Sequence, residues 1–484
     1  MRHRARHRAP SRTATSASAF AAAAAAAVAA GLLTTAPAQA ATAPTSHGLA
    51  DVNGDGYGDL VTASEATVSG ASGAGAVVVN TGSASGISAA RTTVVTQNSA
   101  GVPGAAEKDD AFGSALATAD LNGDGYTDVV TGTPDEKVGS DVDGGTVAVL
   151  WGSKSGLSGG TTIPDPAPSA HDRFGDRLTV GDFDGDGRAE LAVGTSNNGV
   201  WIVDGISKTG TPTQRKLTTA IAPGSSDYYR SLSAGDFDGD GTDDLAVAGR
   251  YDEDGSFDGA TLVYPAATGT PTVLPDEGHS AAVGDFNGDG IDDLALGHRD
   301  ANAVNVYTGA AAGLSASAHR TLTQDTEGVP GVTEDVDSFG QSVAAGDVNH
   351  DGYDDLAVGV DFETIGSVQN AGEVVVLRGS ADGLTGTGAK AIHQGTAGVP
   401  GANENQDRFG TSVRLTDTNK DGYADLAASA PFENTSNGAL WSLRGSASGV
   451  TTSHAVSFSA ATAGVSKATY TYLGRSFATD AYGS

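Results

Sequence analysis

The sequence predicts an all-β fold, a seven-bladed β-propeller with four-stranded antiparallel blades that is closed by pairing of its N- and C-terminal segments. Three observations lead to this prediction. A ten-residue acidic pattern recurs seven times along the 484 residues, each copy lies between short β-type runs, and the segment that precedes most copies occurs once more near the C-terminal end. Repeats of this length with four strands each are typical of propellers.

The acidic pattern reads DVNGDGYGDL in its first copy and DFDGDGTDDL in its fourth. Successive copies start between 49 and 70 residues apart, and the seven begin at Asp51, Asp120, Asp182, Asp236, Asp285, Asp347 and Asp417. An apolar, β-branched run follows each copy, and then come a turn and a further run. Residues 41–484 show no sustained helical periodicity. Each unit therefore reads as a strand, an acidic loop and three more strands, which is one blade.

The strand in front of the loop has its own pattern, as in FGSALATAD from Phe112 and FGQSVAAGD from Phe339. The first loop has no such strand before it, whereas LGRSFATD, from Leu473 to Asp480, matches the pattern and has no loop after it. We expect this C-terminal strand to complete the first blade, because a closed ring leaves no exposed sheet edge. The alternative is that it is a stray degenerate repeat.

Residues 1–40 read as a secretory signal peptide. They have a basic start without acids, an alanine-rich apolar run and the small-x-small sequence Ala38-Gln39-Ala40. A low-complexity tail or a membrane anchor is the alternative, although the apolar run is short for a membrane span. We predict cleavage near Ala40 and secretion, with the propeller occupying 41–484. No later segment has the length and hydrophobicity of a membrane-spanning helix.

Charge and cysteine content narrow the function classes. The formal net charge is −32, which argues against nucleic acid and anionic membranes as partners. Cysteine is absent, so the disulfides that commonly stabilise extracellular domains are missing. A bound metal is the obvious alternative source of stability.

The acidic loop has the chemistry of a calcium site. Numbered from its first aspartate, it places oxygen ligands at positions 1, 3 and 5, a glycine at position 6, a backbone carbonyl at position 7 and a carboxylate at position 9. It is similar to the first half of an EF-hand loop, but Thr62 stands at position 12 of the first copy, and a strand follows instead of a helix. Hard oxygen ligands without histidine or cysteine favour Ca²⁺ over transition metals.

We therefore predict up to seven structural Ca²⁺ ions, one in each blade. The predicted ligands, loop by loop, are Asp51, Asn53, Asp55, Tyr57 and Asp59; Asp120, Asn122, Asp124, Tyr126 and Asp128; Asp182, Asp184, Asp186, Arg188 and Glu190; Asp236, Asp238, Asp240, Thr242 and Asp244; Asp285, Asn287, Asp289, Ile291 and Asp293; Asp347, Asn349, Asp351, Tyr353 and Asp355; and Asp417, Asn419, Asp421, Tyr423 and Asp425.

The alternative is a set of turns whose carboxylates accept backbone hydrogen bonds and hold no ion. Against it, three or four carboxylates that converge without a cation would repel one another. The third loop departs from the rest because the longer Glu190 stands at position 9. His350 and Lys420, at position 4 of their loops, are expected to point outward and are not counted as ligands.

Taken together, the FGxSxAxxD strand, the DxNxDGxxDL loop and the turn after the next strand resemble FG-GAP (VCBS) repeats. Such repeats build the seven-bladed propeller at the head of integrin alpha chains and occur in secreted bacterial proteins. The resemblance covers essentially all of 41–484. The GAP element is poor, being Gly132-Thr133-Pro134 in one unit and Ala430-Pro431 in another. Integrins carry the loop in only some blades, whereas every unit has one here.

Two function classes remain open. One is a non-catalytic binding or adhesion module, expected to be a monomer, for an extracellular protein or glycan. The other is a secreted hydrolase or lyase on a propeller scaffold, with a polysaccharide or ester as substrate. Most acids lie in the metal loops, and the scattered histidines His171, His279, His298 and His393 share no motif, so we favour binding and predict no enzymatic activity.

Three connections between units share a second pattern, GVPGAAEKDDAFG from Gly101, GVPGVTEDVDSFG from Gly328 and GVPGANENQDRFG from Gly398. We expect these acidic segments to lie on the face of the ring opposite the metal loops. They either form a recognition surface or simply cap a strand and solvate the rim. The sequence does not identify the partner.

Overall fold

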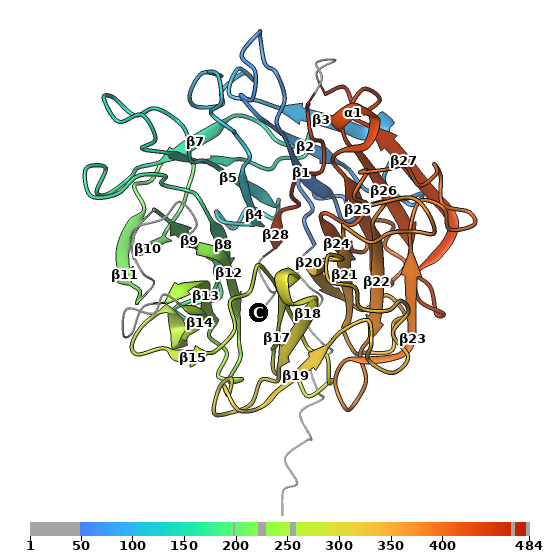
Figure 1. Ribbon diagram of the computed structural model, residues 1–484. Helices are drawn as coiled ribbons and strands as arrows, with labels where there is room; N and C mark the ends of the chain where they lie inside the picture. The colour runs from blue at the N-terminus through green and yellow to red at the C-terminus, as the bar shows by residue number, and fades with distance from the viewer. Residues whose placement is uncertain (1–48, 197–198, 221–228, 252–257, 466–469, 481–484) are drawn as a thin grey trace, which may run out of the picture. The chain divides into compact units, whose positions relative to one another are not determined.

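The computed structural model describes residues 49–196, 199–220, 229–251, 258–465 and 470–480, so the predicted signal peptide lies outside the described residues. Seven β-sheets are arranged radially around a common centre (Figure 1). Strands that follow one another in the chain pair antiparallel within each sheet. The predicted seven-bladed propeller with four-stranded antiparallel blades is confirmed.

The strands of the first four blades, from the centre outward, are β1 (Leu60–Ser64), β2 (Ala76–Asn80) and β3 (Thr92–Val95); β4 (Ala115–Ala119), β5 (Asp128–Thr133), β6 (Thr146–Leu150) and β7 (Gly160–Ile163); β8 (Leu178–Gly181), β9 (Glu190–Gly194), β10 (Gly199–Asp204) and β11 (Thr213–Thr218); and β12 (Tyr229–Gly235), β13 (Asp244–Tyr251), β14 (Asp258–Tyr264) and β15 (Thr272–Leu274).

The strands of blades five to seven, in the same order, are β16 (Ser280–Gly284), β17 (Asp293–His298), β18 (Ala303–Tyr307) and β19 (His319–Leu322); β20 (Phe339–Gly346), β21 (Asp355–Val360), β22 (Glu373–Arg378) and β23 (Thr385–Ile392); and β24 (Val413–Thr416), β25 (Asp425–Ala430), β26 (Ala439–Arg444) and β27 (Thr451–Ser459). A last strand is β28 (Thr479–Asp480).

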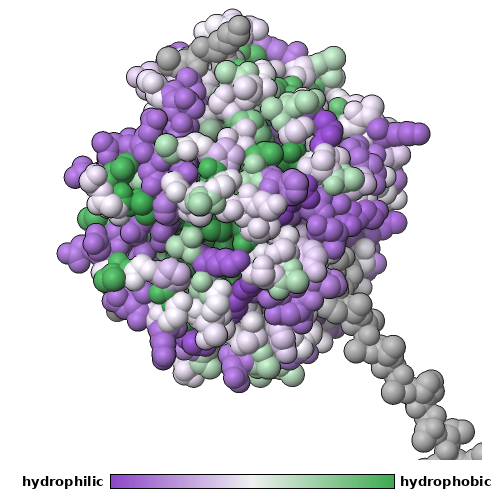
Figure 2. Space-filling view, turned by 90° about the vertical axis from the view of Figure 1, so that its right-hand side faces the viewer, coloured by the Kyte–Doolittle hydropathy of each residue, from purple (hydrophilic) through white to green (hydrophobic). Residues whose placement is uncertain are grey.

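Helical structure is minimal. Within the described residues it consists of the three-residue turns η1 (Ala89–Arg91), η2 (Pro265–Ala267) and η3 (Arg299–Ala301) and the four-residue α1 (Glu433–Ser436). None of these is long and apolar enough to cross a membrane. The surface seen in Figure 2 is mostly hydrophilic or neutral, with hydrophobic side chains in small separate patches.

The hydrophobic core consists of seven clusters, one at each junction between neighbouring blades. The phenylalanine of the FG pattern and the residue at loop position 2 both pack there, as Phe339 and Phe286 do between blades five and six. The inner strand β4 is buried at every residue, whereas five of the six residues of the outermost strand β11 are exposed or half-buried. Burial therefore decreases from the centre outward.

The C-terminal segment supplies the innermost strand of the first blade, as predicted. The Ala63 N–H donates to the Ser476 carbonyl at 3.0 Å, and the Ala478 N–H donates to the Val61 carbonyl at 3.0 Å. Leu473 is fully buried in the cluster between blades seven and one, at the place that phenylalanine takes elsewhere. The segment is therefore a structural part of the ring and not a stray repeat.

Two glycines show that Leu473 occupies the phenylalanine position. A Cβ atom on Gly145, just before the third strand of blade two, would lie 2.4 Å from the Phe174 backbone nitrogen. A Cβ atom on Gly438, just before the third strand of blade seven, would lie 2.4 Å from the Leu473 nitrogen. The same close backbone contact thus joins blade two to blade three and blade seven to blade one.

The C-terminal segment also pairs with blade two, which the sequence did not predict. After pairing with β1, it continues into β28, where Thr479 and Asp480 pair in parallel with Ala117 and Thr118 of β4. In Figure 1, β28 lies between β1 and β4 near the centre of the ring. The last described residues therefore connect blade one to blade two as well as completing blade one.

The closure can be tested at Gly474, where φ is +84° and a Cβ atom would lie 2.5 Å from the Ser429 Cβ. Gly474→Ala should cost about 1–2 kcal/mol for the left-handed backbone and about 1–3 kcal/mol more for overpacking. Gly70→Ala is the matched control, since its φ is +95° and no atom lies within 4 Å of its Cβ position. We expect a clearly larger fall in melting temperature for Gly474→Ala, and equal falls would contradict the closure.

Candidate metal centres

All seven acidic loops lie at the same place in their blades, between the innermost strand and the second strand, as the turn from Asp285 to Asp293 does between β16 and β17. The FG end of the innermost strand lies at the opposite end from its loop. The GVPG segments, which lead into the FG end, are therefore on the opposite face of the ring from the loops, as predicted.

The position-1 carboxylate organises each loop by accepting hydrogen bonds from loop amides. In every loop, one of its oxygens accepts from the glycine N–H at position 6, over distances of 2.7–2.9 Å. The position-5 carboxylate accepts from the N–H at position 7, over 2.9–3.2 Å. These repeated hydrogen bonds give the seven loops the same local backbone geometry.

The position-9 carboxylate is buried and ties the loop to its own sheet. In the first loop, Asp59 accepts from the Val52 N–H at 2.9 Å and from the Gly82 N–H at 2.8 Å. The second contact joins the loop to the residues after β2. Five other loops make an equivalent contact, at Asp128, Asp244, Asp293, Asp355 and Asp425. Position 9 is therefore both a ligand candidate and a structural acceptor.

Burial raises the pKa of every position-9 carboxyl group, with nearby loop carboxylates adding to the shift in most of them. The pKa is raised to about 6 for Asp128 and Asp425, to about 7 for Asp59, Asp244, Asp293 and Asp355, and to about 8 for Glu190. A divalent cation at the centre of the loop would offset both causes, because it compensates for lost hydration and for repulsion between carboxylates.

The third and fourth loops bring carboxylates closest together. Oxygens of Asp182, Asp184, Asp186 and Glu190 all lie within 4.8 Å of one another, as do those of Asp236, Asp238 and Asp240. Glu190 thus reaches the centre of its loop in spite of its extra methylene, and it accepts from the Phe183 N–H at 2.7 Å. All of these donors are hard oxygens, so the residues fit Ca²⁺.

The structure adds two basic side chains that the sequence analysis missed. Lys208 Nζ lies 2.7 Å from Asp124 Oδ2 in the second loop, and its hydrogen bond lowers the pKa of that carboxyl group. Arg378 Nη1 lies 2.9 Å from Asp355 Oδ2 in the sixth loop. Lys208 belongs to the following blade, which explains why no local motif indicates it.

The two unusual position-4 residues reach toward the adjacent loop. The His350 ring is 5.8 Å from the Tyr423 ring of the seventh loop. Lys420 extends toward the first loop, where a Cβ atom on Gly56 would lie 2.2 Å from its Nζ.

Neighbouring loops are connected by backbone hydrogen bonds. For six of the seven pairs of neighbouring loops, the N–H at position 8 of one loop donates to the position-1 carbonyl of the preceding loop, as from Asp243 to Asp182 at 2.8 Å. The connection runs across the closure too, where the Gly58 N–H donates to the Asp417 carbonyl at 2.9 Å. In three loops the position-8 side chain is an aspartate that accepts from the position-1 N–H of the preceding loop, at Asp243, Asp292 and Asp354.

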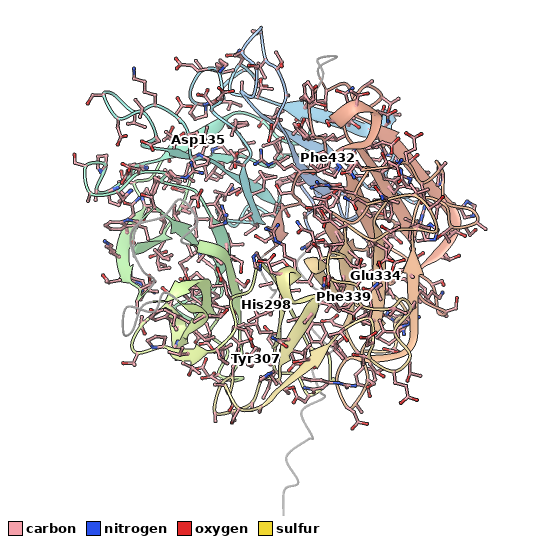
Figure 3. All side chains as sticks on the ribbon, viewed as in Figure 1. Asp135, His298, Tyr307, Glu334, Phe339 and Phe432 are labelled. Carbon is pink, nitrogen blue, oxygen red and sulfur yellow. The ribbon has the colours of Figure 1, made fainter. Side chains whose placement is uncertain are left out.

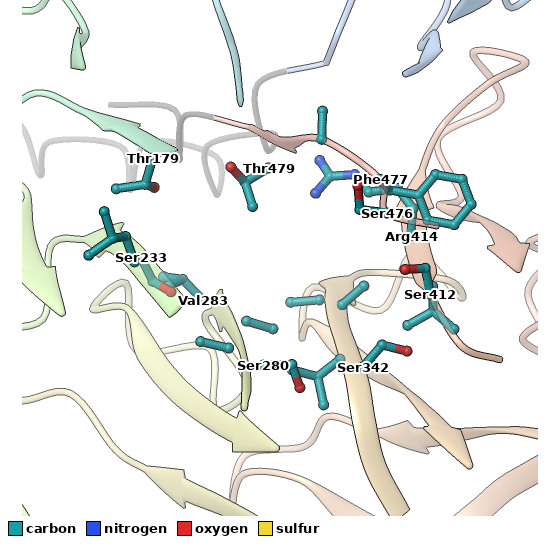
Figure 4. A pocket seen from close by; sticks show the side chains of 18 of the residues that line it. Thr179, Ser233, Ser280, Val283, Ser342, Ser412, Arg414, Ser476, Phe477 and Thr479 are labelled. Atoms are coloured by element: carbon teal, nitrogen blue, oxygen red, sulfur yellow. The ribbon is translucent and has the colours of Figure 1, made fainter. Parts of the chain in front are cut away.

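At the centre of the ring, the inner strands surround a cavity of about 190 Å³. Its lining consists mainly of serine, threonine, alanine and valine side chains (Figure 4). Arg414 is the only charged residue in that lining, and burial lowers its pKa to about 10.

The GVPG segments contribute buried acids. Asp110, Asp337 and Asp407, the aspartates before the FG pattern, are 1–3% exposed, and each accepts from the N–H of the glutamate three residues earlier. The glutamates Glu107, Glu334 and Glu404 are exposed. The buried aspartates cap the turn that leads into the next blade, which supports the structural interpretation for that part of the pattern.

Comparisons with known proteins agree with this architecture. The FG-GAP repeat matches at 112–150, 278–313, 339–377 and 409–443, and an FG-GAP-like repeat matches at 182–247. Each of the four FG-GAP matches spans one loop together with strands on either side of it.

Among the curated proteins, the integrin alpha-PS5 of Drosophila melanogaster is 37% identical over 147 residues, covering 28% of this chain and 14% of that protein. The phosphatidylinositol-glycan-specific phospholipase D of Mus musculus is 32% identical over 146 residues, covering 30% of this chain and 17% of that protein. The chain thus matches less than a fifth of the length of either relative.

Among solved structures, a rhamnogalacturonan lyase of Bacillus licheniformis aligns with a TM-score of 0.42 and 14% identity, over 84% of this chain and 72% of that one. The repeats, their seven-bladed arrangement and the integrin relatives lead to one conclusion. The chain carries FG-GAP repeats and forms an integrin alpha-like β-propeller.

Proposed function

We propose that the chain is a secreted, calcium-binding β-propeller that acts as a non-catalytic extracellular binding or adhesion module for a protein or a glycan. The observation that carries the proposal is the set of seven equivalent acidic loops, two of which bring three or four carboxylates within 4.8 Å of one another, in a chain with integrin alpha relatives. Because the alignments cover only a small part of those relatives, the ligand and the adhesive role are not transferred from them.

Calcium would have a structural role. Loop residues hold the end of the innermost strand against the start of the second strand, and position 9 reaches the residues after the third strand. A cation in the loop would neutralise the converging carboxylates. Because position 1 is hydrogen-bonded to position 8 of the next loop, order in one loop supports order in its neighbour.

An enzyme is the second candidate. It is favoured by the similarity to a protein named phosphatidylinositol-glycan-specific phospholipase D, which is limited to 17% of that protein. The purified chain can be assayed on a panel of polysaccharides, esters and phosphodiesters. Turnover of any of them that is lost on heating and absent from a mock purification would replace the binding proposal with a catalytic one.

Secretion rests on the sequence of residues 1–40. If the signal peptide is cut near Ala40, N-terminal sequencing of protein recovered from the culture medium should start at Ala41. Protein that stays inside the cell with residues 1–40 intact would contradict this part of the proposal.

Calcium should raise the melting temperature strongly. When the free calcium concentration is 100 times the dissociation constant of a site, that site adds about 2.7 kcal/mol to the free energy of unfolding. Extracellular sites work with dissociation constants of about 10⁻⁴ to 10⁻³ M. Asp240→Asn should lower the melting temperature in calcium and have little effect after chelation, whereas the exposed Asp382→Asn should be neutral in both conditions. A melting curve unchanged by a chelator would rule out structural calcium.

The metal-free protein should become less stable as pH rises. The position-9 pKa values of about 6 to 8 in the folded chain exceed those of unfolded carboxyl groups, about 4. The stabilisation due to protonation is therefore fully present below pH 4 and is lost as pH rises to 8. With saturating calcium, which needs ionised carboxylates, stability should instead rise over this window. Melting temperatures of the metal-free and the calcium-saturated protein, each measured at pH 5.5 and 8, test these opposite trends.

Binding should depend on calcium. The tagged chain, incubated with secreted and cell-wall material, should retain a defined protein or glycan in calcium and release it on chelation. Size-exclusion chromatography of the chain alone checks the expected monomer. If capture is equal with a heat-denatured chain, the binding role is wrong.

A further inference from the structure

The face opposite the metal loops carries a second, repeated group of buried oxygen atoms. At three junctions, a glutamine after the outermost strand of one blade donates to a glutamate of the next blade. The pairs are Gln97–Glu136 at 2.7 Å, Gln324–Glu363 at 2.9 Å and Gln394–Glu433 at 2.8 Å. The buried aspartate of the GVPG segment belongs to the same junction. Each junction therefore combines an amide with two carboxylates.

The junction of blades five and six differs from the other two by a third carboxylate. Glu373, the first residue of β22, is 5% exposed and lies against Gln324. The corresponding first residues of β6 and β26 are Thr146 and Ala439. In Figure 3, Glu334 and Phe339, which flank Asp337 in sequence, mark this junction.

Two oxygen atoms at this junction have no hydrogen-bond partner in the described structure. They are Oε1 of Gln324, which is 2% exposed, and Oδ1 of Asp337, which is 1% exposed. The hydrogen bond from Gln324 Nε2 to Glu363 fixes the amide group against the carboxylates. A buried acceptor without a partner is costly. These atoms therefore need something that the side chains here do not supply.

The glycine of the GVPG pattern makes room for the buried amide. Gly331 has φ of +98°, and a Cβ atom there would lie 2.5 Å from Gln324 Nε2. The tight turn is thus built around the glutamine, which keeps its position in the group.

The charge of these carboxylates has no basic partner within the described part of the chain. Among the described residues, no lysine or arginine forms an ion pair with Asp337, Glu363 or Glu373. Burial raises the pKa of Glu373 to about 8, and Glu363 and Asp337 add to the shift. Asp337 and Glu373 are buried and Glu363 is half-buried, so this group of neighbouring carboxylates requires either bound protons or a cation.

We propose that Gln324, Asp337, Glu363 and Glu373 form a Ca²⁺ site at the junction of blades five and six, separate from the seven loops. One amide oxygen and three carboxylates are hard ligands that suit Ca²⁺, and water can complete the coordination. Glu363 is half-buried, so it gives the ion a path from solvent. The ion would join the outer part of blade five to blade six.

The test uses the full chain crystallised in calcium and soaked in roughly 1 mM TbCl₃, a heavy-atom substitute for Ca²⁺. We expect an anomalous difference peak between Gln324 and Glu373 in addition to peaks in the loops. Glu373→Thr, which copies blade two, should lose this peak alone and bind one ion fewer in a calcium titration. Glu334→Gln is the matched control, since its exposed carboxylate is outside the group and its backbone N–H is retained.

Thr146→Glu in blade two should create a corresponding peak at Gln97. A junction without a peak in crystals whose loops are occupied would show that the group holds protons, and the inference would be wrong. A peak that persists in Glu373→Thr would also overturn it. Empty loops with a peak at the junction would contradict the proposed loop calcium and leave this inference standing.

Discussion

Each blade is apolar on both faces, and the whole structure depends on covering those faces. A single four-stranded sheet of this kind would expose its inner valines and leucines, so it is stable only between two neighbours. The seven junction clusters show that the requirement is met all around the ring. Leu473 completes the cluster that would otherwise remain open. The positions of the metal loops and of the central cavity both follow from this closed arrangement.

The sequence predicted the repeated features well, because a pattern that occurs seven times is insensitive to local exceptions. The loop positions, the strand order and the role of Leu473 to Ala478 all followed from the repeats. Contacts made only once were not predictable. Lys208 reaches Asp124 from a different blade, and β28 crosses to β4. The adjacent aspartates at positions 8 and 9 of three loops are visible in the sequence. Only the ring geometry shows that the position-8 aspartate accepts from a backbone amide of the preceding loop.

The acidic composition has a different meaning after the acids are placed in the structure. A net charge of −32 suggests a hydrated acidic surface, yet many of the carboxylates are buried, on both faces of the ring. On the loop face they belong to the acidic loops, and they come closest together in the third and fourth loops. On the other face the exposed glutamates of the GVPG segments conceal buried aspartates beneath them. Burial of so many acidic groups makes stability a matter of what neutralises them, by cation or by proton.

The closure also determines when the chain can fold. The Thr62 hydroxyl donates to the Ser476 carbonyl, a contact between residues 414 positions apart. Contacts this distant in sequence form slowly, because nearly the entire chain has to be ordered between them. During synthesis, the first blade lacks its innermost strand until residues 473–480 have left the ribosome. A chain without this segment exposes the edge of β1, which favours folding after the segment has been made over blade-by-blade folding during translation.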